Sequence, residues 1–473
     1  MERSKLPWRI RIGYGLCTTA DAVPYDLFYI YFIFYLTDIV GVAALTAGAI
    51  SFIAVVWDGI IDPVIGGLSD AYVTKKGRRL PWMKVSVLPL AAVIYFAFAP
   101  IEIKNAALQS VYYVVIPMLI WLFYSTFMIP YYALGAEITK DYNERNILRF
   151  MTVFAGYIAL AFVSSGPMWI WSWAGAAGYG DRQAWGLIGA VFAVFIVIIC
   201  YGGIYLMRDC EKASLGEALK AKSERVRENV YKVWLSCLRE KSFKKIAIWI
   251  MAYSLGFVMV NSICVYLMTH NVGLDAAGQA TFWVVYTLIV IAAMPFITLF
   301  ANKYGKKPVM LAAMGPLLFA AGLFYLIGIE TVAALYIYAG LWGTSSAAFF
   351  TFYVAFAYDC VEIVEYQSGV RREGSMTAIA SLAYQVGSAL GMYAVGAILG
   401  LFGYDGTVAV QSEEARRGIL LAATIIPGFF SLCALAVLAT YKVSKHKYEL
   451  LCAATARKKA GEAYSAAGFE DIL

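Results

Sequence analysis

The sequence predicts an all-α polytopic membrane protein, and three observations support this fold class. First, 62% of the 473 residues are hydrophobic and only 15% are charged, whereas soluble domains carry about 25% charged residues. Second, the apolar residues form about a dozen stretches of the length, about 20 residues, that a membrane helix needs. Third, Lys and Arg concentrate in alternate connections between these stretches. Together they argue against a soluble enzyme, a nucleic-acid-binding domain, a disordered chain and a fibrous protein.

We expect twelve transmembrane helices, which end where polar and charged residues cluster. We expect no cleavable signal peptide, because the first apolar stretch contains Asp21 and Asp26, and a signal sequence has a short uncharged core. The expected spans cover residues 15–40, 45–68, 82–101, 107–136, 148–173, 184–207, 245–268, 277–301, 307–328, 331–358, 375–403 and 417–441.

The basic connections indicate the orientation of the chain. Lys and Arg recur before the first span, after the second, between the two halves, after the eighth and tenth, and in the tail. The intervening connections are short and poor in Lys and Arg, as in residues 41–45 and 327–331. Because positive charge marks the cytoplasmic side, we expect both termini in the cytoplasm.

A weak repeat predicts two similar halves. Gly77-Arg78-Arg79 follows the second span and Gly305-Lys306-Lys307 follows the eighth, while Glu137 and Glu365 follow the fourth and tenth. Such repeats place a pseudo-twofold axis along the membrane normal. We therefore expect a six-helix bundle at 1–207, a cytoplasmic loop at 208–244, a second six-helix bundle at 245–441 and a cytoplasmic tail at 442–473.

The middle loop has the pattern of an amphipathic helix. Ser214 and Glu217 have the spacing of a capping box, and apolar residues from Leu215 to Trp234 recur near helical spacing among Lys and Arg. A linker helix on the cytoplasmic face is the simpler interpretation, and a helix that binds a regulatory partner is the alternative.

Two carboxylates inside the second span predict a cation site. Asp58 and Asp62 are four residues apart and share one helix face. A carboxylate in the membrane costs roughly 2.5–3.5 kcal/mol, and two close together repel unless a proton or cation lies between them. Na⁺ prefers oxygen ligands. Salt bridges to other helices, with no ion, are the alternative.

Other polar groups predict a substrate site. Asp21 and Tyr25 lie in the first span, Met128 and Tyr132 flank Pro130 in the fourth, and Arg149 opens the fifth. Arginine binds anionic or hydroxyl-rich ligands through two parallel hydrogen bonds. An anchor at the cytoplasmic end of the span is the alternative role for Arg149. In the second half we add Tyr353 and Gln385.

Several motifs resemble the glycoside–pentoside–hexuronide:cation symporter family over nearly the whole chain. They are YLTDIVG, WDGIIDPVIGGLSD, KKGRRLPW, IPYYAL, ITKDYNER, DCVEIVEY and YQVGSALG, at 35–41, 57–70, 75–82, 129–134, 138–145, 359–366 and 384–391. The resemblance implies the major facilitator fold, with twelve helices in two six-helix bundles and alternating access. It also implies a place in the cytoplasmic (inner) membrane of a bacterium.

The resemblance assigns roles to individual residues. Asp58 and Asp62 match the cation-binding carboxylates, Ser125 a hydroxyl that completes that site, and Arg149 a cavity arginine, while Asp21 falls in the sugar-binding stretch of the first helix. There are departures from the best-known member: Met128 replaces a sugar-binding aspartate, Tyr132 a tryptophan, Ile61 an asparagine and Gln385 a lysine. A simple galactoside is therefore a poor guess, and a uronide, a sulfosugar or another glycoside fits better.

The basic loops suggest a gate. We expect their cations to pair with carboxylates and hold the cytoplasmic helix ends in the outward-facing state. The residues are Asp70, Arg78, Arg79, Glu137, Lys306, Lys307 and Glu365.

We therefore expect a secondary active transporter that couples H⁺ or Na⁺ to uptake of a sugar, a glycoside or an acidic sugar. The alternative on the same fold is a transporter or exporter of lysolipids or other amphiphiles. We expect no enzymatic activity, because the two histidines and the absence of an HExxH motif leave no catalytic constellation. We also expect a monomer in the lipid bilayer, with no cofactor beyond the coupling ion, no nucleic acid, and a bound Na⁺, if any, at Asp58 and Asp62.

Overall fold

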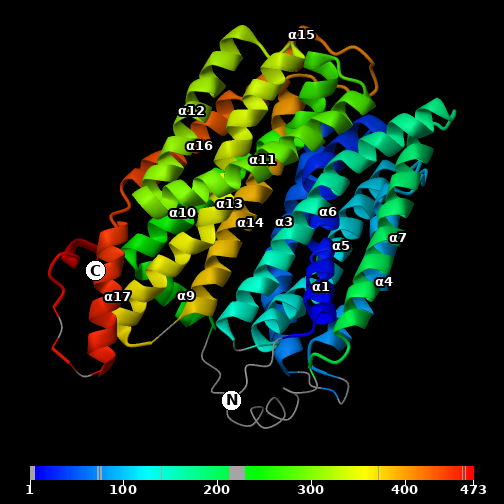
Figure 1. The fold of residues 1–473 in the computed structure, drawn as a ribbon. Helices are drawn as coiled ribbons and strands as arrows, with labels where there is room; N and C mark the ends of the chain where they lie inside the picture. The colour runs from blue at the N-terminus through cyan, green and yellow to red at the C-terminus, as the bar shows by residue number, and fades with distance from the viewer. Residues whose placement is uncertain are drawn as a thin grey trace. The chain divides into compact units, whose positions relative to one another are not determined.

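In the computed structural model, the described part of the chain is mostly helical, and it contains no strand beyond one isolated bridge between Thr74 and Gly77 (Figure 1). This confirms the predicted all-α class. The described residues are 6–71, 74, 77–139, 141–211, 230–370, 372–460, 462–463 and 465–472. The proposed amphipathic helix lies outside them from Ser214 to residue 229, as do Lys75, Lys76 and Arg371, whereas its last residues, from Val230, are helical in α9 (Val230–Arg239).

Eleven helices within these residues are long and apolar enough to cross a membrane. They agree with the second to twelfth expected spans. They are Ala44–Ser69, Leu80–Phe98, Ala106–Gly135, Ile147–Ala176, Asp181–Met207, Lys241–Val272, Ala276–Tyr304, Lys306–Ile327, Val332–Ser368, Glu373–Leu401 and Glu413–Ala439.

The first expected span is not one continuous α-helix. The chain is helical from Trp8, but it divides into α1 (Trp8–Cys17), α2 (Thr19–Asp26) and two π-helical segments, η1 (Leu27–Phe32) and η2 (Tyr35–Val40). Pro24 lies inside α2 and has no N–H to bond the carbonyl group of Ala20. π-Helical turns commonly occur at functional sites. The apolar length of this span was predictable from the sequence, but its division was not.

The last expected span is divided as well, into α15 (Glu413–Ala423) and α16 (Ile425–Ala439). The break lies at Thr424, because Pro427 cannot donate to the carbonyl group of Ala423 and its ring clashes with that group in a continuous helix. The hydroxyl group of Tyr338 donates to this carbonyl oxygen at 2.7 Å. The lost helical hydrogen bond is thus replaced, as the membrane interior requires.

The described chain forms two compact units. Unit 1 contains α1 to α7, of which α3 is Ala44–Ala71, α4 Leu80–Phe98, α5 Ala106–Glu137, α6 Tyr142–Ala176 and α7 Asp181–Met207. Two segments of the second half, Cys264–Val284 and Met392–Ala415, also belong to it. In unit 1, α4 packs on α5 and α7, α3 packs on α5, and α1 packs on α7. These contacts bring the polar residues of α2, α3, α5 and α6 into one unit.

Unit 2 holds the rest of the second half, with close packing between α12 and α13, α12 and α16, and α13 and α17. It contains α9 (Val230–Arg239), α12 (Lys306–Ile327), α13 (Val332–Ser368), α17 (Lys445–Ala460) and most of α10 (Lys241–Tyr266), α11 (Ala276–Tyr304) and α14 (Glu373–Leu401). In unit 1, α7 ends at Met207. The expected tail is ordered as α17 and a short turn, η4 (Glu470–Ile472).

Glycines of α14 make close helix contacts in both units. A Cβ atom at Gly391 would lie 2.6 Å from the carbonyl oxygen of Leu255 on α10, within unit 2. A Cβ atom at Gly396 would lie 2.7 Å from the Cα atom of Gly48 on α3, within unit 1. Small residues four apart on a helix allow such close backbone approaches.

Candidate functional site

The two carboxyl groups of α3 meet one hydroxyl group of α5. Ser125 Oγ lies 3.1 Å from Asp58 Oδ1 and 2.6 Å from Asp62 Oδ1. Asp58 is 3% exposed and Ser125 is fully buried. The four-residue spacing on α3 and the packing of α3 on α5 produce this arrangement. The structure therefore brings together the three residues expected to bind a cation.

A proline in α3 leaves one backbone carbonyl oxygen without its helical hydrogen bond. Pro63 lies inside α3 and has no N–H for the carbonyl group of Gly59, which stands between the two aspartates in the sequence. In the described part of the chain, no group of three or more His, Cys, Asp and Glu side chains could hold a metal ion. A Na⁺ ion here would thus need hydroxyl, carbonyl or water oxygens beside the two carboxylates, whereas a proton needs none.

A second polar group connects α2, α5 and α6. Tyr124 on α5 donates a hydrogen bond of 2.6 Å to Asp21 on α2. Tyr132, half exposed, also hydrogen-bonds Asp21, and the charge of Arg149 on α6 acts on the same carboxyl group. The guanidinium group of Arg149 is exposed and has no hydrogen bond or ion pair with the described residues. Three of the expected substrate residues, Asp21, Tyr132 and Arg149, thus lie near one another, and the exposed guanidinium group of Arg149 is the cation among them.

Aromatic rings border this polar group. Tyr25 packs against Tyr29 and Trp121 with ring centroids 4.6 and 5.9 Å apart, and Trp121 packs against Tyr124 at 5.2 Å. Met128, only 1% exposed, is packed within the protein.

Sequence reasoning missed Trp121 and Tyr124 as members of the site. A signal was available, because Trp121, Tyr124, Ser125, Met128 and Tyr132 recur at the spacing of one α5 face. It also left open the role of Asp26, whose Oδ2 atom is buried without a hydrogen-bond partner among the described residues.

Two expected substrate residues lie in unit 2. Tyr353 on α13 stacks on Phe349 at 5.4 Å and lies 6.3 Å from Tyr384, which precedes Gln385 on α14. Phe349 also stacks on Tyr253 of α10 at 4.3 Å. The second half therefore contributes a largely aromatic cluster.

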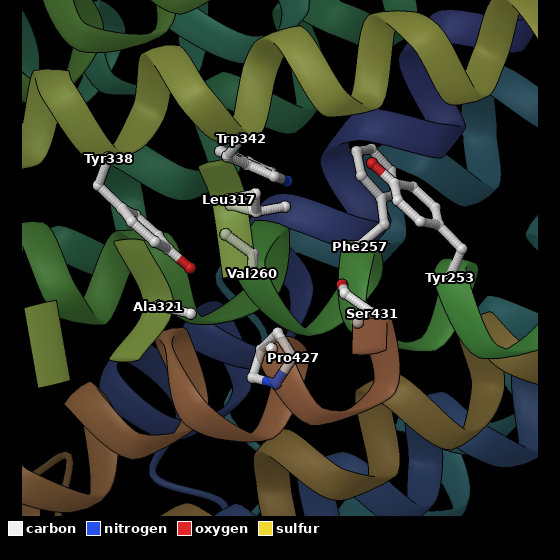
Figure 2. A pocket seen from close by; sticks show the side chains of 11 residues that line it. Tyr253, Phe257, Val260, Leu317, Ala321, Tyr338, Trp342, Pro427 and Ser431 are labelled. Carbon is white, nitrogen blue, oxygen red and sulfur yellow. The ribbon is translucent and has the colours of Figure 1, made fainter. Parts of the chain in front are cut away.

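Unit 2 also contains a small pocket among α10, α12, α13 and α16. Figure 2 shows Tyr338 and Trp342 on one side of it and Pro427 and Ser431 on the other. Its lining is mainly apolar, and the charged residues expected at the site belong to unit 1. We assign it no role in transport.

The expected gate residues of the first half form a connected network. Arg79, 4% exposed, donates to Glu137 at 2.9 Å and to Ser69 at 3.0 Å, and Arg78 lies 3.6 Å from Glu137. Glu211 accepts the backbone N–H groups of residues 78, 79 and 80 at the N-terminus of α4. The side chain of Asp70 lies outside the described residues. Sequence reasoning missed Glu211, which follows α7 and has no nearby motif.

The expected gate residues of the second half contact groups that the sequence did not point to. Lys306 bonds Asp359 at 2.6 Å, and Lys307 donates to the carbonyl groups of Ala439 and Tyr441. Glu365, 6% exposed, instead pairs with Lys459 of α17 at 2.6 Å. Lys306 pairs with Asp359, which precedes Glu365 on α13, and Lys459 of the C-terminal helix pairs with Glu365.

Comparison with known proteins identifies the fold. The nucleoside transporter NupG superimposes with a TM-score of 0.64 at 12% identity, covering 92% of this chain and all of the other. A bacterial homologue of the lysosomal transporter Spinster superimposes with a TM-score of 0.62 at 10% identity and covers 93% of this chain. These likenesses confirm the major facilitator fold.

Sequence relatives are symporters and sugar carriers. The isoprimeverose transporter of Lactiplantibacillus pentosus is 25% identical over 95% of this chain and 92% of its own length. The glucuronide carrier protein homologue of Escherichia coli K12 is 24% identical over 96% of this chain and 97% of its own length. The E. coli protein YagG, named a putative glycoside/cation symporter, is 22% identical over 95% of both chains.

The family itself follows from a model that matches most of the chain. The model, described as MFS/sugar transport protein, matches residues 13–445. It confirms the resemblance that the motifs indicate, and the relatives are membrane transporters rather than enzymes. The chain belongs to the MFS/sugar transport family, as a multi-pass transporter of the major facilitator superfamily.

Proposed function

We propose that this protein is a cation-coupled symporter that carries a sugar or glycoside, including acidic sugars, by alternating access. The observation that supports it most is the meeting of Asp58, Asp62 and Ser125 inside the membrane. Both carboxyl oxygens lie within hydrogen-bonding distance of the Ser125 hydroxyl group. This hydroxyl group has one proton and can donate it to only one of them at a time. A proton or Na⁺ at this place relieves the repulsion that remains.

We propose H⁺ as the coupling ion, with Na⁺ as the alternative. Ile61 supplies no oxygen beside the pair, and the loss of a ligand weakens a Na⁺ site more than a proton site.

The substrate site we propose is the group of Asp21, Tyr124, Tyr132 and Arg149. Tyrosine and aspartate bind sugar hydroxyl groups, and the exposed guanidinium group of Arg149 suits a carboxylate or sulfonate. Relatives named for glucuronide and isoprimeverose support a sugar or glycoside as cargo. None of these names favours the lysolipid alternative.

In this proposal, substrate binding is coupled to cation binding because the two sites include adjacent residues of α5. Tyr124 belongs to the substrate group and Ser125 to the cation group, so an ion that fixes Ser125 also fixes Tyr124. By linkage, the substrate then tightens cation binding by the same factor, typically about 5–150-fold.

We propose that the transporter lies in a bacterial inner membrane with both termini in the cytoplasm. Its bacterial relatives and the alternation of basic connections support this. The groups around Glu137 and Asp359 would then lie on the cytoplasmic side, where we propose that they gate the helix ends.

Counterflow in proteoliposomes tests this function. Liposomes loaded with isoprimeverose, a glucuronide or a lysolipid are diluted into trace labelled compound, at fixed pH with and without Na⁺ and then with a pH gradient. We expect exchange of a sugar or glycoside and accumulation driven by the pH gradient. Glu414, an exposed carboxylate at the start of α15, provides the control variant Glu414→Gln. Exchange of the lysolipid alone would contradict the proposal.

A further inference from the structure

Two equivalent segments of the halves end in the same unusual way. The π-helical turns η2 (Tyr35–Val40) and η3 (Leu267–Val272) both finish at a left-handed glycine, Gly41 and Gly273. Aligned on these glycines, Asp38 of the first half corresponds to His270 of the second. An acid and a base thus occupy matching positions of the repeat, and both segments belong to unit 1.

The two side chains meet through a tyrosine from a third segment. Tyr404, which follows α14 in unit 1, donates a hydrogen bond of 2.6 Å to Asp38 Oδ1, and His270 Nε2 lies 2.9 Å from the same hydroxyl group. His270 Nε2 itself lies 3.8 Å from Asp38 Oδ1. The side chains of Asp38 and His270 are only 12% and 8% exposed. The three segments are therefore joined by one nearly enclosed polar group.

A second chain of hydroxyl groups reaches the other oxygen of the same carboxyl group. Tyr266 OH lies 2.6 Å from Thr37 Oγ1, which in turn lies 2.6 Å from Asp38 Oδ2. Since an ionised carboxylate only accepts hydrogen bonds, both chains orient their protons toward Asp38. Burial and the charge of Asp38 raise the pKa of Tyr404, so Tyr404 stays a neutral donor.

The neighbouring charged residues in the described part of the chain do not pair with this group. Arg182 of α7 donates to the carbonyl groups of residues 39 and 40 and not to the Asp38 carboxyl group. Asp405, the neighbour of Tyr404, is exposed and accepts from Thr407. The groups in contact with His270 are therefore Asp38 and Tyr404, and Tyr404 in turn packs edge-on against Tyr266.

We propose that Asp38, Tyr404 and His270 form a second proton-binding site, separate from Asp58 and Asp62, and that its proton holds η2, η3 and the segment after α14 together. In the proposed topology this is the outer end of the helices. A proton on His270 places a positive charge beside the Asp38 carboxylate, which strengthens the contact. The joined arrangement is thus favoured in acid, and it weakens as the pH rises through the range in which histidines lose their proton, between about pH 5 and 8.

The test measures the separation of η2 and η3 against pH by electron–electron resonance. Spin labels are placed on Ala43→Cys and Ala277→Cys, both exposed and outside the polar group. The partly exposed cysteines, Cys210, Cys433 and Cys452, are replaced by Ser. We expect the short-distance population to fall roughly 5-fold or more between about pH 5.5 and pH 8.5, because this is the lower bound of typical coupling between sites.

Two variants and one control identify the proton site. His270→Gln keeps a hydrogen-bonding side chain and should remove the pH dependence, while Tyr404→Phe should reduce it by separating the acid from the base. His446→Gln, which changes the only other histidine of the chain, should leave it as in the parent. A pH-independent distance in the parent, or the same pH dependence in His270→Gln, would overturn the proposal. Because the readout is a distance, this outcome is independent of the ion that Asp58 and Asp62 bind.

Discussion

Ser125 has one hydroxyl proton, and two carboxyl oxygens lie within hydrogen-bonding distance of it. Ser125 thus sets how much of the repulsion between Asp58 and Asp62 remains for the proposed coupling ion to relieve. The sequence predicted all three residues, because the four-residue spacing and the family motifs point to them. It did not predict that Tyr124, beside Ser125, bonds Asp21, since this contact depends on how α2 packs on α5.

Removing the hydroxyl group of Ser125 should weaken the cation site without removing its charges. In Ser125→Ala, the cation concentration needed for half-maximal uptake should rise about 10-fold or more, because a hydrogen bond to a charged group contributes about 1.5–3 kcal/mol. Uptake measured against H⁺ and Na⁺ concentration checks this. Ser110→Ala, near the start of the same helix and partly exposed, is the matched control. An unchanged cation dependence would exclude Ser125 from the site.

The charge of Arg149 is retained but its planar shape is lost in Arg149→Lys. If two parallel hydrogen bonds hold an acidic sugar, affinity for a glucuronide should fall about 10-fold or more. Binding measured by counterflow inhibition checks this, with Arg457→Lys on the exposed face of α17 as the control. Unchanged affinity would assign Arg149 to anchoring the end of α6.

At the scale of elements, helix breaks and close helix contacts shape the site. Prolines at 24, 63 and 427 interrupt the hydrogen bonding of α2, α3 and the α15–α16 pair. The sequence predicts where such breaks are allowed, but not which groups replace the lost bonds, such as Tyr338 for the carbonyl group of Ala423. The replacement comes from distant residues, which periodicity does not connect.

The contact between α14 and α10 gives a direct test of close packing. A Cβ atom at Gly387 would collide with the backbone of Met251 and the side chain of Ser254. Gly387→Ala should therefore lower stability by about 1–3 kcal/mol, the usual cost of overpacking. Gly315→Ala, in open space on α12, should instead be neutral or stabilising by up to about 1 kcal/mol. Thermal unfolding in detergent compares them, and equal melting temperatures would contradict the predicted contact.

At the scale of the whole molecule, composition was enough to predict a polytopic helical membrane protein, because a membrane requires long apolar helices, and the motifs were needed to predict a transporter. Long-range pairing was beyond sequence reasoning. Glu365 was expected in the gate, but nothing in the sequence pointed to Lys459 of the C-terminal helix, with which it pairs at 2.6 Å. The sequence likewise did not indicate that Asp38, His270 and Tyr404 come together. Such contacts depend on packing between segments far apart in the sequence.

Reporter fusions test the orientation of the chain. Fusions after Lys306 and after Arg371 should report the cytoplasm, and one near Asp405 should report the outside, because basic connections remain inside. Phosphatase and fluorescent-protein reporters measure the two sides. An outside signal at Lys306 would contradict the twelve-span topology, and a cytoplasmic signal at Asp405 would place the Asp38–His270 group on the inner side.

Uphill uptake in the Asp58→Asn, Asp62→Asn double variant tests the central claim most directly. Proteoliposomes containing this variant, the parent and Glu414→Gln are given an imposed pH gradient, then a Na⁺ gradient, and accumulation is compared with exchange at equilibrium. We predict that the double variant loses accumulation but retains substrate exchange, because the substrate group around Asp21 remains intact. Full accumulation in the double variant would contradict the coupling role of this pair.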